Sequence, residues 1–381
     1  MGGMTALPQS RAAPAQPTAP LLPPVARTPS LVIDLDIVER NARRMADAVA
    51  ARGLALRPHV KTHKSVRLAQ MQLNAGAQGV TVGTLGEAEV MVAGGVDDLF
   101  IAYPLWVSGD KVERFRSLHD RARQLGVGVD SAHGAQRLAE AVSGSRRRLR
   151  VLIEVDPGNG RTGVRPGAVA GLARAATSAG LEVVGAFTHG GHAYRGADAV
   201  ASAAADEVEV LAAAAEALRS AGIEPEVISA GSSPTALRDL VRPVTEVRPG
   251  TYLLGDRQQV ALGASPADGV AIAIASTVIS TTVPGQVVID AGAKSLTKDQ
   301  PAYLPGYGSL AAYPDGTIER VFDYHGAVVF PDGAARPELG EVVAVLPNHA
   351  CPVVDLYDSF IASRAGSIVG RWPVDARGRS G

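Results

Sequence analysis

Leu54–Lys64 reads LALRPHVKTHK, a short apolar run followed at once by basic and imidazole side chains. The run Leu54–Pro58 predicts a β-strand, and the polar residues begin where that strand ends. Chemistry in barrels of parallel strands gathers at the carboxyl ends of the strands, where a lysine can be partly buried and able to form a Schiff base. For an isolated lysine a solvated basic turn is the better interpretation, so this one depends on the rest of the chain.

Seven more predicted strands follow Leu54–Pro58 in alternation with helical patterns. They are Gly79–Val82, Leu99–Ala102, Val127–Asp130, Leu149–Val155, Glu182–Thr188, Glu226–Ser229 and Val244–Arg248. One intervening helix is predicted from a Ser108 cap to about Gln124. Strict alternation is typical of a parallel sheet, and eight units favour an α/β fold with a closed (β/α)8 barrel of the TIM type over an open, doubly wound sheet.

The pattern changes after about Tyr252, where short Ile-, Val- and Thr-rich runs are separated by turn signals such as Pro284-Gly285. This texture predicts a second, mostly β domain over residues 254–381. The barrel is predicted over residues 28–253, with the alternative that its first strand, Leu31–Leu35, joins the β domain. Residues 1–27 are rich in Pro and Ala and lack periodicity, so they are predicted to be a disordered tail.

Composition excludes several classes of protein. The chain has 381 residues, of which 46% are hydrophobic and 20% charged, which is a globular balance. A net charge of −1 argues against nucleic acid as a partner, and no apolar segment is long enough to predict a membrane span. A single cysteine excludes an intrachain disulfide and, with no secretory signal pattern, predicts a cytoplasmic protein.

Other predicted strand ends carry polar, glycine-rich segments as well. They are Glu154–Gly163 (EVDPGNGRTG), Thr188–Tyr194 (THGGHAY), Ser229–Ser233 (SAGSS) and Arg248–Tyr252 (RPGTY). Glycines permit tight loops, and backbone N–H groups with hydroxyls at a helix start suit a phosphate. Each segment alone is weak, but five of them at predicted strand ends indicate one site.

These segments carry a family resemblance. The chain resembles the alanine racemase-like, fold-type III pyridoxal phosphate enzymes, and within them the branch of D-serine dehydratases, D-threonine aldolases and 3-hydroxyaspartate dehydratases. The matching pieces span Thr28 to about Asp358. They are Arg57–Lys64, Gly160–Gly163 (GRTG), Thr188–His192 (THGGH), the Ser/Gly run at 229–233, RPGTY at 248–252, Asp290–Leu296 (DAGAKSL) and Pro347–Cys351 (PNHAC).

The resemblance implies catalytic roles for two residues. Lys61 matches the position that forms the Schiff base with pyridoxal 5'-phosphate, and Lys64 is then expected to be ordinary surface. His189 is expected against the face of the cofactor ring. Arg248 falls where the family places the partner of the pyridine nitrogen, and an arginine there leaves the ring less electron-withdrawing, so that a second electrophile would help.

The remaining cofactor-binding residues also follow from the resemblance. Arg161 is expected to orient the ring oxygen or the substrate. The predicted phosphate ligands are Gly231, Ser232 and Tyr194. Tyr252 is a further residue expected to bind the cofactor.

His349-Ala-Cys351 is the candidate metal motif. On a strand, residues i and i+2 face the same way, so this pair predicts a clamp that holds one Zn²⁺ and leaves open positions for substrate and water. A thiolate favours zinc, with another divalent metal as the alternative. Taken alone, the pair indicates a buried structural histidine and cysteine. Together with the family resemblance, it indicates a metal site instead.

These residues lead to a function hypothesis with open alternatives. We expect a lyase that uses pyridoxal phosphate and zinc and converts D-serine or D-threonine, small D-β-hydroxy-α-amino acids, to a 2-oxo acid and ammonia. A D-threonine aldolase, with His189 or His192 as base, would give glycine and acetaldehyde instead. An amino-acid racemase would pair Lys61 with a tyrosine of the second domain, for which Tyr303, Tyr307 and Tyr313 are available. A non-catalytic cofactor-binding protein is a further alternative. The resemblance also implies a homodimer.

Overall fold

The computed structural model describes residues 17–18, 20–238 and 240–381. Most of the predicted disordered tail, residues 1–16 and 19, lies outside this part of the chain. Leu22 and Val25, by contrast, pack against a buried cluster of Val32, Ala275 and Ile361. The prediction of disorder is therefore wrong for this end of the tail, because apolar side chains between its prolines cover a sheet.

One sheet is a barrel of eight parallel strands in the order β2-β9-β8-β7-β6-β5-β4-β3. Beyond β2, a parallel bridge between His59 and Thr81 and a 2.8 Å hydrogen bond from Thr81 N to Pro58 O join the two ends of this order. The (β/α)8 fold class is confirmed. The strands are β2 (Ala55–Leu56), β3 (Val80–Val82), β4 (Asp98–Pro104), β5 (Gln124–Val129), β6 (Arg150–Glu154), β7 (Glu182–Phe187), β8 (Val227–Ala230) and β9 (Glu246–Val247).

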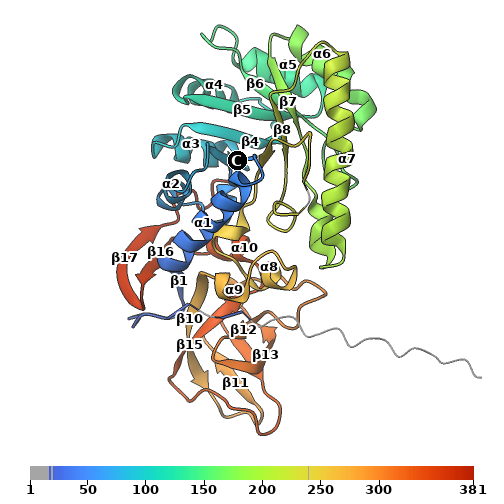
Figure 1. Cartoon of the computed structure of the whole chain (residues 1–381). Coiled ribbons are helices and arrows are strands. Elements are labelled where there is room, and N and C mark those ends of the chain that lie inside the picture. Colours follow the sequence, from blue (N-terminus) through green and yellow to red (C-terminus); the bar gives the residue numbers. More distant parts are fainter. Residues whose placement is uncertain (1–16, 19, 239) are drawn as a thin grey trace, which may run out of the picture.

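Helices connect the strands on the outside of the barrel, as Figure 1 shows. They are α2 (Val66–Asn74), α3 (Leu85–Ala93), α4 (Lys111–Arg121), α5 (Ala132–Ala141), α6 (Val169–Ser178) and α7 (Ala199–Ser220). Helix α4 ends before the predicted Gln124, because that residue already begins β5. Among the described helices, none combines the length and the apolarity that crossing a membrane requires.

The second sheet has nine strands in the order β11-β14-β13-β12-β15-β10-β1-β16-β17, and β10 also pairs with β11. The first strand of the chain, β1, pairs with β10 and β16 and so belongs to this sheet. The strands are β1 (Ser30–Asp34), β10 (Ile272–Ser280), β11 (Gln286–Ile289), β12 (Gly308–Leu310), β13 (Tyr313–Val321), β14 (Gly326–Val329), β15 (Val342–Pro347), β16 (Ser359–Arg364) and β17 (Ser367–Pro373).

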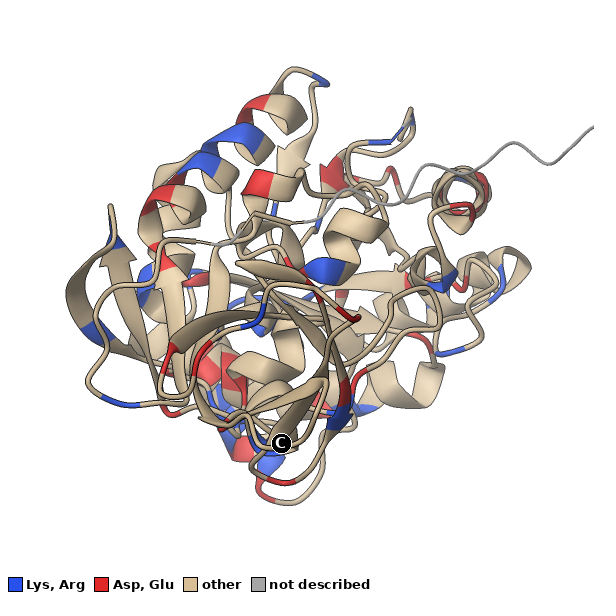
Figure 2. Cartoon of the chain, turned by 90° about the horizontal axis from the view of Figure 1, so that it is seen from below, with Lys and Arg blue, Asp and Glu red and all other residues tan. Residues whose placement is uncertain are grey.

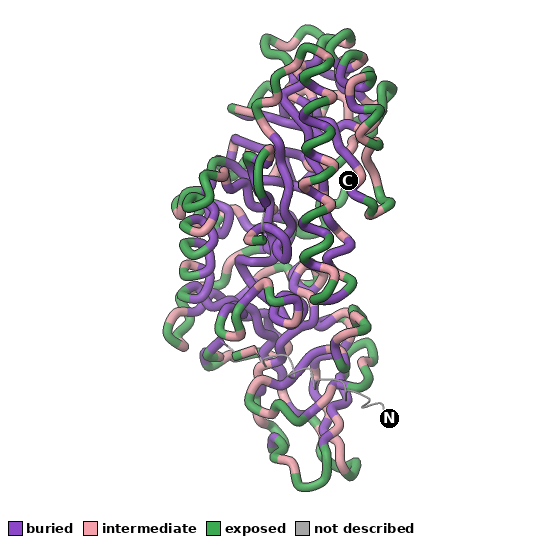
Figure 3. The backbone as a smooth tube through the Cα atoms, turned by 45° about the vertical axis from the view of Figure 1, so that its right-hand side comes forward, coloured by how far each residue is buried: buried purple, intermediate pink, exposed green. Residues whose placement is uncertain are grey.

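Short helices and one long helix lie where the two sheets meet. Figure 1 shows α1 (Leu35–Ala50) crossing from β1 to the barrel, with α8 (Arg257–Ala261), α9 (Ala293–Leu296) and α10 (Ala350–Val354) at the junction. The strands of both sheets are mostly buried and the outer helix faces are exposed, as Figure 3 shows. Acidic and basic residues are interspersed along the ribbon in Figure 2, in keeping with the net charge of −1.

The interior of the barrel holds a buried charge network beside an apolar cluster. The Arg57 guanidinium donates from Nε to Glu246 Oε2 at 2.8 Å and from its NH1 atom to Asp98 Oδ1 at 2.5 Å. Ser229 Oγ donates to Glu246 Oε1 at 2.6 Å and accepts from the guanidinium of Arg248 at 2.5 Å. One cation thus faces two carboxylates inside the barrel, where an unpaired charge is strongly unfavourable.

We predict that Arg57→Ala lowers the free energy of unfolding by about 3–5 kcal/mol, because it leaves Asp98 and Glu246 buried without their shared cation. The matched control is Arg123→Ala. Arg123 also bonds Asp98, at 2.8 Å, but its side chain is 60% exposed, so its removal costs about 1 kcal/mol or less. Urea unfolding of both variants measures the difference, and equal losses would contradict the account.

Candidate active site

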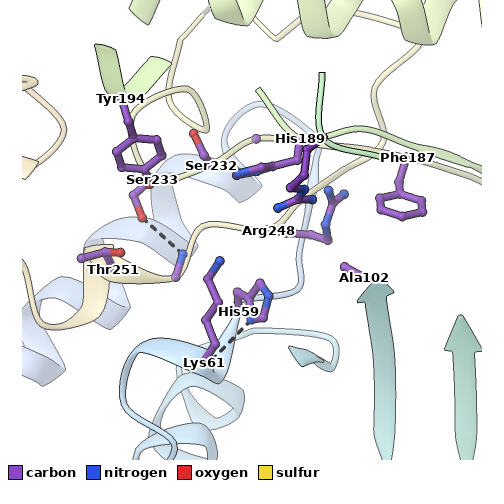
Figure 4. Close-up of a pocket in the computed structure, with 13 residues that line it drawn as sticks. His59, Lys61, Ala102, Phe187, His189, Tyr194, Ser232, Ser233, Arg248 and Thr251 are labelled. Carbon is purple, nitrogen blue, oxygen red and sulfur yellow. Dashed lines mark hydrogen bonds between the residues drawn. The ribbon is translucent and has the colours of Figure 1, made fainter. Parts of the chain in front are cut away.

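A pocket opens at the carboxyl ends of the barrel strands, close to the β domain. Figure 4 shows Lys61 entering from one side, with His189, Ser232 and Arg248 across the cavity. The lining residues are His59, Lys61, Ala102, Arg161, Phe187, His189, Tyr194, Gly231, Ser232, Ser233, Arg248, Gly250 and Thr251. Seven of the eight predicted cofactor-binding residues are brought together here; Tyr252 is the exception.

Lys61 lies in a single turn of 3-10 helix, Val60–Thr62, that begins directly after β2 and Pro58. Its backbone N–H donates to His59 Nδ1 at 3.3 Å, and its side chain is exposed toward the pocket. Burial lowers the pKa of His59 well below its ordinary value, and the cations Lys61 and Arg248 lower it further. Burial, Lys61 and Arg161 lower the pKa of His189 in the same way. Both imidazoles are therefore neutral at physiological pH.

Arg248 is held rigidly at the end of β9. Besides Ser229 Oγ, its guanidinium donates to the Thr188 carbonyl at 2.5 Å, and it lies 5.2 Å from the ring centroid of Phe187. The side chain is buried. These contacts aim a permanently charged, planar donor into the pocket.

Two glycine-containing loops form the narrow end of the pocket. Gly231 has a φ of +80°, and a Cβ there would lie 3.2 Å from Val247 Cβ; a Cβ on Gly250 would lie 2.8 Å from the His59 carbonyl oxygen. Ser233 Oγ accepts from Gly250 N at 3.2 Å and so joins the loops after β8 and β9. The two loops form a glycine cradle along the pocket, and side chains at these glycines would collide with packed protein atoms.

Glu207, on α7, anchors the loops after β7 and β8 from behind. Its Oε1 accepts from Gly190 N at 2.9 Å and from Gly231 N at 3.2 Å. The residue is completely buried, and burial raises the pKa of its carboxyl. Its second oxygen, Oε2, has no hydrogen-bond partner among the described residues.

Arg161 lines the pocket from the loop after β6, and Glu154 lies next to it at the end of that strand. Glu154 is buried and accepts from Thr162 Oγ1 at 2.8 Å, while the Arg161 guanidinium lies 3.5 Å away from it. The Arg161 side chain is 45% exposed. Arg161 is therefore less constrained than Arg248 and free to turn toward a ligand.

Two sequence-based expectations are wrong in this region. The Tyr252 side chain is buried outside the pocket, where its hydroxyl accepts from Gln72 Nε2 at 3.0 Å, because the turn after β9 points it toward α2. Lys64, expected at the surface, is buried and pairs with Asp355 at 2.8 Å. Only the first lysine of the motif therefore faces the pocket.

His349 and Cys351 lie at the start of α10, with His349 as its N-cap residue and Cys351 in its first turn. The sequence-based prediction placed both residues on a strand. That prediction is wrong, because β15 ends at Pro347. The two side chains nevertheless lie close enough for each to shift the pKa of the other. Burial raises the pKa of Cys351, but His349 outweighs burial and holds that pKa below its ordinary value. The thiolate, which is the metal-binding form, is thereby favoured.

The surroundings of this pair orient it toward the Lys61 loop. His349 Nδ1 lies 2.6 Å from Asp299 Oδ2, and Cys351 Sγ lies 3.1 Å from Thr62 Oγ1. Asp256 is buried and accepts from Ala350 N at 2.8 Å, which fixes the start of α10. Within the described part of the chain, no group of three or more His, Cys, Asp or Glu residues is arranged to hold a metal, so these residues offer two ligands.

Other candidates for catalysis are occupied elsewhere. His192 Nε2 lies 3.0 Å from Asp206 Oδ2 on α7, and the Tyr313 hydroxyl donates to Glu341 at 2.8 Å. Tyr303, in contrast, has a buried hydroxyl without a partner among the described residues, and burial raises its pKa to about 12. Of these three side chains, Tyr303 alone is left without a hydrogen-bond partner.

Sequence reasoning missed several residues of the site. Gly250 and Thr251 lie in a quoted motif, and their position at a strand end was a usable signal. Glu207 gave no signal within an alanine-rich helix, and Asp299 gave none in an irregular loop. Both residues act by bonding to other segments of the chain, and sequence spacing does not reveal such contacts.

Two family models and several known proteins match this chain in sequence. Residues 33–258 match the family described as "Alanine racemase, N-terminal domain", and residues 271–363 match the "Putative serine dehydratase domain". The D-threo-3-hydroxyaspartate dehydratase of Delftia sp. strain HT23 is 34% identical, over 91% of this chain and 96% of that protein. The D-threonine aldolase of Arthrobacter sp. is also 34% identical, over 96% of each.

Solved structures agree with these relationships. The D-threonine aldolase from Filomicrobium marinum superposes with a TM-score of 0.86 at 33% identity, over 95% of this chain and 99% of that one. A cysteine-to-alanine variant of a D-threo-3-hydroxyaspartate dehydratase, solved in a metal-free form, has a TM-score of 0.84 at 32% identity, over 92% of this chain and 97% of that one. The chain therefore belongs to the alanine racemase-like, fold-type III family of pyridoxal phosphate enzymes, in the branch with a serine dehydratase-type C-terminal domain.

Proposed function

We propose that this chain is a metal-dependent pyridoxal phosphate lyase that dehydrates a D-β-hydroxy-α-amino acid to a 2-oxo acid and ammonia. The observation that carries the proposal is the 3.1 Å contact between Thr62 Oγ1 and Cys351 Sγ, which joins the Lys61 loop to the metal-ligand pair. A proton acceptor in the pocket and a candidate electrophile site beside it are therefore joined by one contact. The named relatives, a dehydratase and an aldolase, support a lyase of this substrate class.

The pocket residues fit the cofactor. Lys61 offers the amine for covalent attachment, and the glycine cradle of Gly231 and Gly250, with Ser232, offers a site for the phosphate. Arg248 is the candidate partner of the pyridine nitrogen. His189 is the candidate to lie against the face of the ring. Pyridoxal phosphate supplies the electron sink that makes the α-proton of an amino acid removable.

The chain's own groups account for the proton movements. With the cofactor bound and the substrate amine attached to it, the free amine of Lys61 would be the group that takes the α-proton. Arg248 cannot give up a proton at neutral pH, so it holds the ring nitrogen by hydrogen bonding alone. This limits the electron sink and makes help at the leaving hydroxyl valuable.

His349 and Cys351 are the residues that would hold the metal. An imidazole with a thiolate suits Zn²⁺, which is the ion we propose, and a pair leaves coordination positions open. At such a site a divalent metal supplies a Lewis acid that stabilises a departing hydroxide. Asp299 orients His349 by accepting from its other ring nitrogen, as partners of metal-binding histidines do.

An aldolase is the second candidate, because a D-threonine aldolase is as similar to this chain as the dehydratase is. That reaction needs a base for the β-hydroxyl proton. His192 bonds Asp206 instead, which leaves His189, a neutral imidazole in the pocket, as the candidate. The Cys351 thiolate is the reason to prefer dehydration.

D-Serine and D-threonine are the substrates we favour within the class. A substrate with a second carboxylate, such as 3-hydroxyaspartate, calls for an additional cation. Arg257, at the start of α8, donates to Asn348 Oδ1 at 2.5 Å and to the Pro305 carbonyl at 3.1 Å. Both bonds come from its NH1 atom, and Arg257 does not line the pocket. The homodimer stays a prediction from the resemblance.

We predict that the protein, supplied with pyridoxal phosphate and Zn²⁺, converts D-threonine to 2-oxobutanoate and ammonia and leaves L-threonine unchanged. Product identification by mass spectrometry, with D-serine and D-threo-3-hydroxyaspartate in parallel, tests reaction and substrate together. Glycine with acetaldehyde would establish the aldolase instead. Inverted threonine would indicate a racemase, and Lys61→Ala must abolish whichever turnover is found.

We predict that Cys351→Ala reduces bound metal to less than half of the wild-type content, since a lone histidine holds a divalent ion weakly. Elemental analysis of the purified proteins measures this directly. The control is Asp358→Ala, a substitution of an exposed carboxylate outside the pocket. Wild-type metal content in Cys351→Ala would rule out this site.

We predict that Glu207→Ala weakens pyridoxal phosphate binding about tenfold, because Gly190 and Gly231 lose the acceptor that fixes both loops. Glu207→Gln keeps an acceptor oxygen and should bind nearly as the wild type does. Glu209→Ala, on the exposed side of the same helix, is the control. Titration followed by cofactor absorbance gives the affinities, and equal loss in Glu207→Gln would mean that the charge matters instead.

A further inference from the structure

The second lysine of the 57–64 motif faces away from the pocket. Lys64 is 8% exposed and has a φ of +50°, in the left-handed region that residues other than glycine seldom adopt. Its Nζ lies 2.8 Å from Asp355 Oδ1 and 3.6 Å from Glu87 Oε1. A side chain in this backbone conformation persists only where its surroundings fix it from several directions.

Some of those surroundings come from the C-terminal segment Val374–Arg379, here called the strap. Ala376 N donates to the Lys64 carbonyl oxygen at 2.9 Å, and Gly378 N donates to Asp355 Oδ1 at 3.3 Å. Asp355 thus connects the strap to the Lys64 ammonium. Figure 1 shows the C-terminus lying on the barrel near α3, beyond the last strand of the β domain.

The strap also caps the helix that follows the Lys61 loop. Val66 N, at the start of α2, donates to Asp375 Oδ2 at 2.8 Å. The helix's own N-cap residue, Ser65, makes no side-chain cap bond. A capping oxygen satisfies a backbone N–H that a helix start otherwise leaves unpaired, so Asp375 replaces a missing local cap.

The opposite side of the loop is held by the metal-ligand pair through Thr62 and Cys351. Lys61 lies between these two attachments, one residue before Thr62 and three before Lys64. Its own backbone is otherwise held by the 3.3 Å bond to His59. The position of its side chain in the pocket therefore depends on both attachments.

We propose that the strap positions Lys61, with Asp375 and Ala376 as positioning residues that act through Lys64 and the start of α2. The strap lies outside the pocket lining and touches no reacting atom. The inference rests on the proposed function, in which Lys61 carries the cofactor. Loosening the strap should let the 59–66 loop open and expose the lysine–cofactor linkage.

Asp375→Ala in the cofactor-loaded enzyme tests this. We expect amide hydrogen exchange over residues 60–68 to become about fivefold faster, the effect of losing one helix cap on a local opening equilibrium. Removal of the cofactor by hydroxylamine, followed by loss of its visible absorption, should accelerate by a similar factor. The turnover number should fall more than KM rises.

Two matched variants separate positioning from general destabilisation. Asp375→Asn keeps an acceptor oxygen for Val66 N and should restore both rates. Asp332→Ala alters an exposed carboxylate of the β domain that lies outside the strap; it should change neither. If Asp375→Ala does not fold, Asp355→Asn repeats the test by weakening the Lys64 ion pair while keeping an oxygen for Gly378 N.

The outcomes distinguish this inference from the proposed function. Faster exchange with an unchanged hydroxylamine rate would overturn the proposal, because the loop would then open without affecting Lys61. Unchanged exchange in both test variants would overturn it as well. Borohydride reduction that still attaches the cofactor to a lysine in Lys61→Ala would instead show that another lysine carries it, and the proposed function would fail on its own.

Discussion

Eight parallel strands that close on themselves bring all of their carboxyl ends to one rim, and the rest of the site depends on this constraint. The bridge between His59 and Thr81 completes the ring directly beside Lys61. Loops separated by nearly two hundred residues, such as those carrying Lys61 and Arg248, therefore face each other across one pocket. No local pattern in either loop could bring them together, because the strand ends alone define their meeting point.

Buried polar side chains outside the pocket hold in place the residues and loops that line it. Arg57, Glu246 and Ser229 form a chain of hydrogen bonds inside the barrel that ends on Arg248. Glu207 holds two loops from α7. Each such group is costly to bury alone and stabilising when paired, so the same contacts that fix the fold also fix the geometry of the pocket.

Periodicity in the sequence was sufficient to predict the strands and the barrel, since each of the eight apolar runs corresponds to an observed strand. Residues placed by a strand end, such as Lys61 and His189, were predictable for the same reason. Contacts across the domain junction were not. Lys64 is buried where the strap, three hundred residues away in the chain, bonds its carbonyl oxygen. The spacing of residues in the sequence does not show that the turn after β9 directs Tyr252 toward Gln72.

Lys61 is proposed to carry the cofactor, in a pocket whose Lys61 loop contacts Cys351 through Thr62. Borohydride reduction of the cofactor-loaded protein, followed by proteolysis and mass spectrometry, tests it most directly. The account predicts a single pyridoxyl label, on Lys61, with Lys64 unmodified. A label on Lys64 or on any other lysine, with Lys61 unmodified, would contradict it.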